Sequence, residues 1–119
     1  MTEEHFQGFI AAWFRRDVDA VMTFMSQDCI YTTSMGPEPG RTYTGYQAVR
    51  HIFADILAED DGTELHLGQL FLSGNIGYQE WWYTETRSNG ERIPHRGIDV
   101  YQFEGDKIKV KNVFRKVLA

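Results

Sequence analysis

We expect a single α+β domain over residues 1–119, with helices packed on one face of a curved antiparallel sheet. Three observations predict this class. Apolar residues recur at helical spacing in the first half of the chain, and they alternate with polar residues in the second half. Turn-forming residues break the second half at 73–75, 88–90 and 105–106. The chain has no linker, repeat or low-complexity segment, and its length suits one domain.

The first residues predict two helices. Residues from about 3 to 16 form an amphipathic pattern whose apolar members are Phe6, Phe9, Ile10, Trp13 and Phe14. Asp17 can cap a second short helix, whose inward residues are Val18, Val21, Met22 and Met25.

A short strand at about 29–34 and a loop over 35–40, which contains two prolines, come next. Thr44 and Gln47 have the spacing of a capping box. They predict a third helix that ends at 60–62 and whose apolar stripe is Val49, Ile52, Phe53, Ile56 and Leu57.

The segment 96–116 predicts a hairpin with a two-residue turn at Gly105-Asp106. That turn pairs Phe103 with Ile108, Tyr101 with Val110, and Asp99 with Asn112. Lys109, Lys111 and Arg115 then share the opposite, solvated face of the last strand.

Asp99 is the main candidate for a functional residue. Its carboxyl group faces apolar neighbours, and a lone buried charge is costly, so Asp99 needs a partner or becomes a proton carrier. The predicted pairing makes Asn112 the residue that orients it. The alternative, that Asp99 and Asn112 form a purely structural hydrogen-bonded pair, stays open.

Extending the register through a two-residue turn at Asn89-Gly90 places Glu80 opposite Asp99 and Trp82 opposite Gly97. His95 lies on the same face and is a candidate proton carrier, as Glu80 is. A bulge near this turn would flip the upstream strand and exchange Trp82 for Trp81 and Tyr83.

Composition favours a pocket for a small apolar molecule. Aromatic residues make up 14% of the chain, enough to line a cavity for a flat ligand. The net charge of −5, with no long basic block, argues against nucleic acid. The four histidines lack metal-ligand spacing, so we expect no metal and no cofactor. Cys29 is the single cysteine, which suits the reducing cytoplasm, and neither a secretory signal nor a membrane span is visible.

Three phrases, Arg16-Asp-Val-Asp-Ala20, Gly45-Tyr-Gln-Ala-Val-Arg50 and Asp106-Lys-Ile108, resemble landmarks of the SnoaL-like and ketosteroid-isomerase-like branches of the nuclear-transport-factor-2-like superfamily. The resemblance covers nearly the whole chain. It implies a cone-shaped, cystatin-like fold, in which a curved antiparallel sheet wraps around three N-terminal helices.

The resemblance also implies site residues. Ile98-Asp99-Val100 resembles the segment that holds the oxyanion-hole acid of ketosteroid isomerases. Phe9 stands where those enzymes have a tyrosine, and Thr33 stands where they have a proton-shuttling aspartate. The fold borders its mouth with the first strand, so Tyr31 can point a hydroxyl group towards a ligand.

We therefore expect a protein that binds a hydrophobic small molecule, with isomerase, cyclase or lyase chemistry on a carbonyl compound. The alternative is a non-catalytic ligand-binding or dimerisation module, because this fold hosts both. Catalytic candidates are Asp99, His95 and Asn112, and the expected lining is Phe9, Trp13, Tyr31, Glu80, Trp82 and Tyr101. A homodimer is expected through an outer sheet face that carries Trp81, Tyr83, Ile98, Val100 and Val113.

Overall fold

The computed structural model describes residues 1–36, 39–59 and 62–117. Two helices come first, α1 (Glu3–Phe14) and α2 (Val18–Met22), followed by β1 (Met25–Thr32), β2 (Thr42–Thr44) and α3 (Tyr46–Ala58). Four strands complete the chain: β3 (His66–Ser73), β4 (Ile76–Thr86), β5 (Arg92–Glu104) and β6 (Lys107–Arg115). Helices therefore precede a four-strand meander, as predicted.

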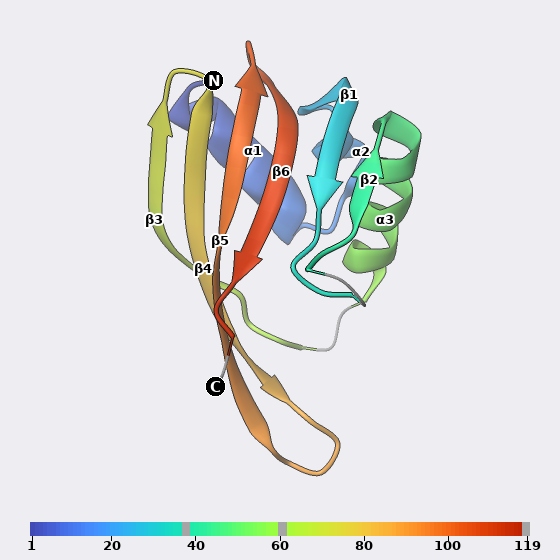
Figure 1. Cartoon of the computed structure of the whole chain (residues 1–119), viewed down its shortest axis with the longest axis vertical. Coiled ribbons are helices and arrows are strands. Elements are labelled where there is room, and N and C mark those ends of the chain that lie inside the picture. Colours follow the sequence, from blue (N-terminus) through green and yellow to red (C-terminus); the bar gives the residue numbers. More distant parts are fainter. Residues whose placement is uncertain (37–38, 60–61, 118–119) are drawn as a thin grey trace.

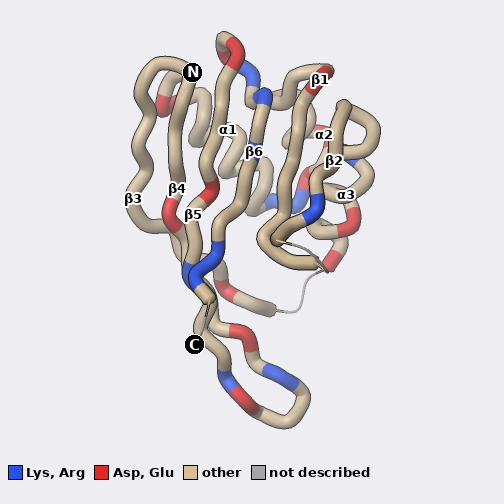
Figure 2. The backbone as a smooth tube through the Cα atoms, viewed as in Figure 1, with Lys and Arg blue, Asp and Glu red and all other residues tan. Residues whose placement is uncertain are grey.

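The strands form one six-stranded sheet in the order β2-β1-β6-β5-β4-β3. The helices lie behind this curved sheet in Figure 1, so one face is covered and the other is open. β1 runs parallel to β6, whereas all other neighbours are antiparallel. The β4–β5 hairpin projects beyond the rest of the sheet, and Figure 2 shows both signs of charge on it.

Of the two helix caps predicted from the sequence, the structure contains one. Asp17 caps α2, because its Oδ1 accepts a hydrogen bond of 3.1 Å from the Ala20 amide. The capping box at Thr44 was wrong: α3 begins at Tyr46 after Gly45, which has a φ of 94° and makes no side-chain cap bond. Met25, predicted at the end of the second helix, begins β1.

Four residues that the sequence assigned to loops or helix ends, Pro37, Glu38, Asp60 and Asp61, lie outside the described residues. Within the described ranges, no helix is long and apolar enough to cross a membrane.

The core forms between the helices and the inner face of the sheet. Val49, Phe53 and Leu57 of α3 are buried at intervals of four residues, which confirms the predicted stripe. On α1, Phe6 is fully buried and meets the Tyr101 ring edge-to-face at 5.0 Å between ring centroids. The helical periodicity of the sequence thus determines which side of each helix faces the sheet.

A β-bulge in β6 changes the register of the last hairpin. Phe103 pairs with Ile108, as the turn at Gly105-Asp106 predicts, but Gln102 pairs with Val110. Lys109 is therefore an extra residue in β6. Because successive side chains alternate between faces, the extra residue reverses the orientation of everything that follows it.

The connection between β4 and β5 is longer than the predicted two-residue turn, and the pairing register of these strands differs from the prediction by one residue. It spans residues 87–91, closed by a hydrogen bond of 2.8 Å from the Arg87 amide to the Glu91 carbonyl. Gly90 takes the left-handed φ of 85° that this loop needs. Asp99 consequently pairs with Gln79 rather than with Glu80, and Gly97 pairs with Trp81 rather than with Trp82.

Candidate functional site

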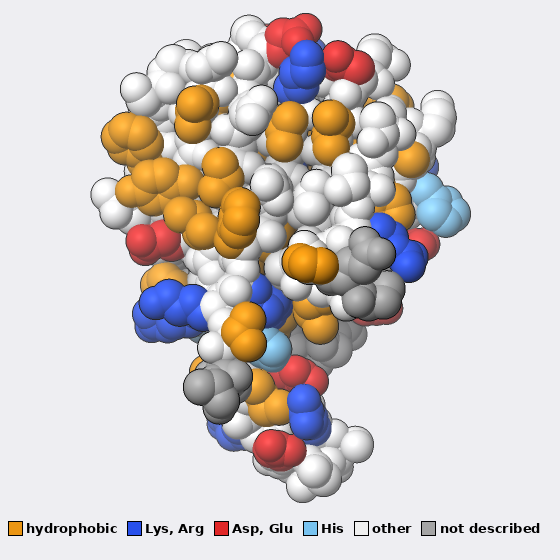
Figure 3. Space-filling model, viewed as in Figure 1, with side chains coloured by type: hydrophobic (Ala, Val, Ile, Leu, Met, Phe, Trp, Pro, Cys, Tyr) orange, Lys and Arg blue, Asp and Glu red, His pale blue; other side chains and the backbone are white. Residues whose placement is uncertain are grey.

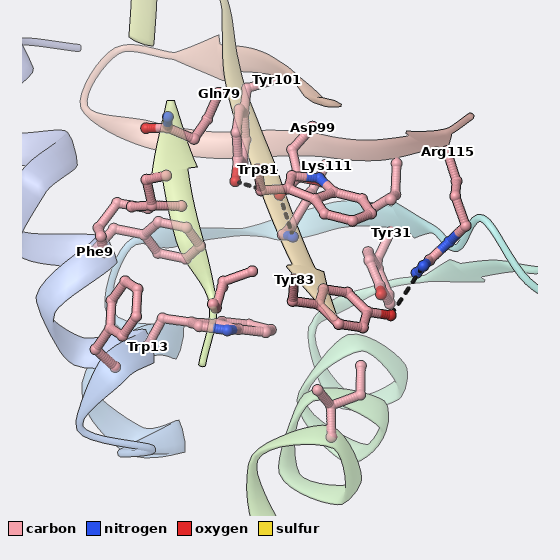
Figure 4. Close-up of a pocket in the computed structure, with 16 residues that line it drawn as sticks. Phe9, Trp13, Tyr31, Gln79, Trp81, Tyr83, Asp99, Tyr101, Lys111 and Arg115 are labelled. Atoms are coloured by element: carbon pink, nitrogen blue, oxygen red, sulfur yellow. Dashed lines mark hydrogen bonds and ion pairs between the residues drawn. The ribbon is translucent and has the colours of Figure 1, made fainter. Parts of the chain in front are cut away.

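A cavity of about 220 Å³ lies between α1 and the inner face of the sheet (Figure 4). Its walls are mostly aromatic and aliphatic, and its charged groups come from β5 and β6. A second hollow of about 290 Å³ adjoins it, since Trp13, Leu65 and Tyr83 line both.

Asp99 is held at the cavity wall by three donors. Its Oδ1 accepts a hydrogen bond of 2.9 Å from the Trp81 indole N–H. Its Oδ2 accepts from the Tyr101 hydroxyl group at 3.3 Å and from Lys111 Nζ at 3.0 Å. All of these neighbours donate, so the carboxyl group acts as an acceptor anchored by a buried cation.

Lys111 is the cation that compensates Asp99. The residue is 6% exposed, and its ammonium group lies 5.0 Å from the centroid of the Trp13 ring and 5.5 Å from that of Tyr31. Burial on its own lowers the pKa of Lys111, but attraction to Asp99 outweighs burial, and the pKa lies above its ordinary value. Lys111 is therefore a charged hydrogen-bond donor and not an amine nucleophile.

The tyrosines around this pair stay protonated. Burial raises the pKa of Tyr101 well above its ordinary value, and the negative charge of Asp99 raises it further. Burial also raises the pKa of Tyr31, although the charge of Lys111 partly offsets that effect. Both phenols can donate a hydrogen bond to a ligand or to a carboxylate, but neither is a base near neutral pH.

Arg115 forms a second polar cluster on the cavity wall. Its Nε donates to Ser34 Oγ at 3.1 Å, and its Nη1 donates to the Tyr83 hydroxyl oxygen at 2.9 Å and to His95 Nδ1 at 2.6 Å. Since Nδ1 accepts, the proton of His95 is on Nε2, which donates to Glu85 at 2.8 Å. This hydrogen bond from His95 is the main cause of the lowered pKa of Glu85.

Gly97 makes room for Trp81. A β-carbon at Gly97 would overlap the Trp81 ring and the backbone carbonyl oxygen of Phe114. Trp81 is 7% exposed, and a side chain at Gly97 would displace the ring whose indole N–H donates to Asp99. The glycine therefore helps to orient the polar centre of the cavity.

The structure brings five of the predicted site residues to the cavity. The lining includes Asp99 together with four aromatic residues, namely Phe9, Trp13, Tyr31 and Tyr101. His95 does not line the cavity itself but contacts Arg115 and Tyr83, which do.

The other three predicted site residues lie on the outer face. Asn112 pairs with Val100, so its predicted pairing with Asp99 was wrong; the bulge at Lys109 turns its side chain away from the cavity. Glu80 and Trp82 were also misplaced, because the longer β4–β5 connection moves β4 by one residue. The predicted alternative, in which a shift brings Trp81 and Tyr83 inward, is the one the structure shows.

Three further residues that line the cavity, Gln79, Lys111 and Arg115, were not expected there from the sequence. The two cations had been placed on a solvated strand face because they alternate with apolar residues. The signal that could have found Lys111 is Asp99 itself. A lone acid on an apolar face requires a cation, and a one-residue bulge in the facing strand supplies it.

The chemistry available at the site is hydrogen-bond donation into an apolar space. Among the described residues, no group of three or more histidine, cysteine or acidic side chains could hold a metal ion. Cys29 is buried outside the cavity, and burial raises the pKa of its thiol to about 11, so it is not an activated nucleophile. The polar groups that can address a ligand are Lys111, Arg115 and the tyrosine hydroxyls.

Comparison with known families identifies the fold and the family. The profile of the SnoaL-like domain matches residues 6–110, which is most of the chain. The chain belongs to the SnoaL-like domain family. It is thus a member of the nuclear-transport-factor-2-like superfamily, with the cone-shaped, cystatin-like fold that its sequence landmarks indicate. No curated protein matches the chain.

Solved structures share the fold of this SnoaL-like domain at low sequence identity. An NTF2-like protein of unknown function from Mesorhizobium loti is 19% identical with a TM-score of 0.79, and the match covers 96% of this chain and 89% of that one. A protein from Catenulispora acidiphila with a ketosteroid isomerase-like fold, in complex with trimethylamine, is 17% identical, with a TM-score of 0.73 and coverage of 96% and 86%. An uncharacterised cystatin fold protein from Novosphingobium aromaticivorans is 22% identical, with a TM-score of 0.72 and coverage of 94% and 96%.

Proposed function

We propose that this SnoaL-like domain binds an apolar carbonyl compound in the cavity between α1 and the sheet. The observation that carries the proposal is the position of Lys111. Its ammonium group lines a mostly apolar cavity and uses one hydrogen bond on Asp99, which leaves further N–H donors for a ligand oxygen. A charged donor in an apolar site favours a polarised carbonyl oxygen over a hydrocarbon.

The family and the fold support a small-molecule site. The Catenulispora acidiphila protein has the same fold and was solved in complex with trimethylamine. In the present chain, the aromatic rings that could surround a small cation already surround Lys111. The ligand of this chain is therefore better matched to a hydrogen-bond acceptor than to an amine.

A second candidate function is proton-transfer catalysis on the same compound, as in an isomerase, cyclase or lyase. The ammonium group of Lys111 favours it, because a fixed positive charge stabilises an enolate oxygen. The reaction also needs a base. Asp99 already accepts from three donors, and both ring nitrogens of His95 are engaged. Because these hydrogen bonds occupy the candidate bases, ligand binding is the better supported function.

Calorimetric titration with 2-acetonaphthone and 2-ethylnaphthalene tests the binding site, since the two compounds differ in the carbonyl oxygen. We expect the ketone to bind about 2- to 10-fold more tightly, the effect of one net hydrogen bond. Leu65→Trp should abolish binding of both by filling the space that the two hollows share. Val117→Trp, at a position that is 90% exposed, is the control. Absence of binding, or binding unaffected by Leu65→Trp, would contradict the proposed site.

The same ketone separates a binder from an enzyme. Proton abstraction would exchange its methyl protons for deuterium in heavy water, which NMR measures directly. A binder leaves the exchange at the buffer rate. For an enzyme that uses Asp99 as base, Asp99→Asn should slow the exchange by about 100-fold or more.

We propose, in addition, that the domain forms a homodimer through its outer sheet face. Figure 3 shows hydrophobic side chains gathered over β3, β4 and β5 on this face. The patch consists of Phe71, Ile76, Tyr78, Ile98, Val100 and Phe114, of which Phe71, Ile76 and Phe114 are about half exposed. Ile98 and Val100 belong to the surface expected from the sequence, whereas Trp81, Tyr83 and Val113 line the cavity. An apolar patch of this kind marks a protein interface.

Sedimentation equilibrium tests the dimer. The wild-type protein should sediment at twice the chain mass of 13.8 kDa at micromolar concentration. Tyr78→Lys should shift it to the monomer, because Tyr78 stacks on Phe71 near the centre of the patch, where a buried charge is costly. Thr84→Lys is the matched control on the same strand and face, in the projecting hairpin. A wild-type protein that sediments only as a monomer would refute the interface.

We propose that the protein is located in the cytoplasm. The single cysteine, Cys29, is buried and unpaired, which suits a protein that works in the reducing cytoplasm.

A further inference from the structure

Arg115 is a cation without an anionic partner among the described residues. Its three hydrogen bonds go to neutral acceptors, namely Ser34 Oγ, the Tyr83 hydroxyl oxygen and His95 Nδ1. The nearest acid in this cluster, Glu85, bonds to the far side of His95 and also lies 3.6 Å from Arg87. These neighbours therefore orient the guanidinium group of Arg115 but do not neutralise its positive charge.

The guanidinium group of Arg115 is held in place and still has donors to offer. It lies 4.9 Å from the centroid of the Trp81 ring and 5.5 Å from that of Tyr83, so its plane is supported by aromatic rings. Its three bonds use Nε and Nη1, whereas Nη2 makes none. Nη2 is not completely buried, so its N–H groups remain free to donate to a ligand.

The other charged groups of the cavity cancel each other. Lys111 and Asp99 form an ion pair of 3.0 Å in which both side chains are almost fully buried. The net charge of the cavity wall is thus the single positive charge of Arg115. Apolar walls strengthen the field of such a charge, because they exclude water.

We propose that Arg115 binds a carboxylate and that the ligand of this cavity is therefore a hydrophobic carboxylic acid. A guanidinium group matches a carboxylate in geometry and in charge. Because the acceptors that hold Arg115 are neutral, none of them competes with the carboxylate of a ligand. The inference rests on the proposed function, because it names the class of ligand that the same cavity takes.

The position of Arg115 on β6 also defines where the acid group lies relative to the carbonyl. Arg115 and Lys111 are four residues apart on the same strand face, so their backbone positions differ by about 13 Å along the strand. The Trp81 ring lies beside the polar groups of both, through its bond to Asp99 and its stacking on Arg115. The geometry thus fits a molecule with a carboxylate at one end, an apolar body over Trp81 and a carbonyl oxygen at Lys111.

Calorimetric titration with 2-naphthoate and 2-naphthamide at neutral pH tests the inference, since the two compounds share their rings and differ in charge. The wild-type protein should bind the carboxylate at least about tenfold more tightly than the amide. Arg115→Gln should remove this preference, because it should weaken binding of the carboxylate far more than binding of the amide. Arg115→Lys should retain part of the preference, because it keeps the charge and loses the fork.

Arg96→Gln is the matched control. Arg96 lies on the neighbouring strand β5, but its guanidinium group stacks on Trp82 at the outer face, 5.5 Å from the ring centroid. The Arg96→Gln variant loses one positive charge, as Arg115→Gln does, but it should still prefer the carboxylate to the amide. Equal affinities in the wild-type protein, or a preference that survives Arg115→Gln, would overturn the inference alone. Failure of the wild-type protein to bind either compound or 2-acetonaphthone would overturn the proposed function with it.

Discussion

Replacing Lys111 with methionine should destabilise the protein by about 3–5 kcal/mol, the usual cost of leaving one member of a buried ion pair without its partner. Methionine fills much of the space of the lysine stem but cannot compensate the charge of Asp99, whose side chain is 14% exposed. Urea denaturation followed by circular dichroism measures the change in the free energy of unfolding.

Two further variants separate the ion pair from simple loss of a lysine. The double variant Asp99→Asn with Lys111→Met removes both charges and should recover most of the lost stability. Lys109→Met is the matched control, because Lys109 lies on the same strand and its ammonium group forms ion pairs with the exposed acids Asp28 and Glu104. Its effect should be much smaller than that of Lys111→Met. A Lys111→Met protein as stable as the control would show that the pair is not buried as described.

Replacing Gly97 with alanine should destabilise the protein by about 1–3 kcal/mol through overpacking. The added methyl group would overlap the Trp81 ring and the Phe114 carbonyl oxygen, and backbone atoms cannot move aside cheaply. Displacement of Trp81 would also break its hydrogen bond to Asp99, so tryptophan fluorescence should change together with the free energy of unfolding.

Gly68→Ala controls for the general effect of alanine in a strand. Gly68 lies in β3, and its new methyl group would meet only the side chains of Glu80 and Trp82 at the outer face among its three nearest atoms, not backbone atoms. We expect a smaller loss of stability and no loss of ligand affinity. If both variants behave alike, the fit between Gly97 and Trp81 is not what positions the polar centre.

The sequence alone was sufficient for the architecture. Helical spacing placed Phe9 and Trp13 on the buried side of α1, where both line the cavity. Gly105-Asp106 correctly predicted a two-residue turn and the pair Phe103–Ile108. These features depend on residues close together in the chain, so local pattern and turn chemistry suffice to predict them.

The residues that line the cavity depended on two register shifts, of which the sequence offered one as an alternative and did not indicate the other. The extra residue Lys109 turned Lys111 inward and Asn112 outward. The longer β4–β5 connection exchanged Trp82 for Trp81 in the same way. Since side chains alternate with a period of two, a shift of one residue replaces a whole set of lining residues by its neighbours.

The role of Asp99 depends on both the sequence and the tertiary structure. The sequence by itself determined that this acid lies on an apolar strand face and requires a partner. Only the tertiary structure decided that the partner is Lys111, because its ammonium group lies among Asp99 of β5, Trp13 of α1 and Tyr31 of β1, which are far apart in the chain. An ion pair buried among aromatic rings is favourable only when all of them are assembled, so its energy acts on the folded domain and leaves no trace in the local sequence pattern.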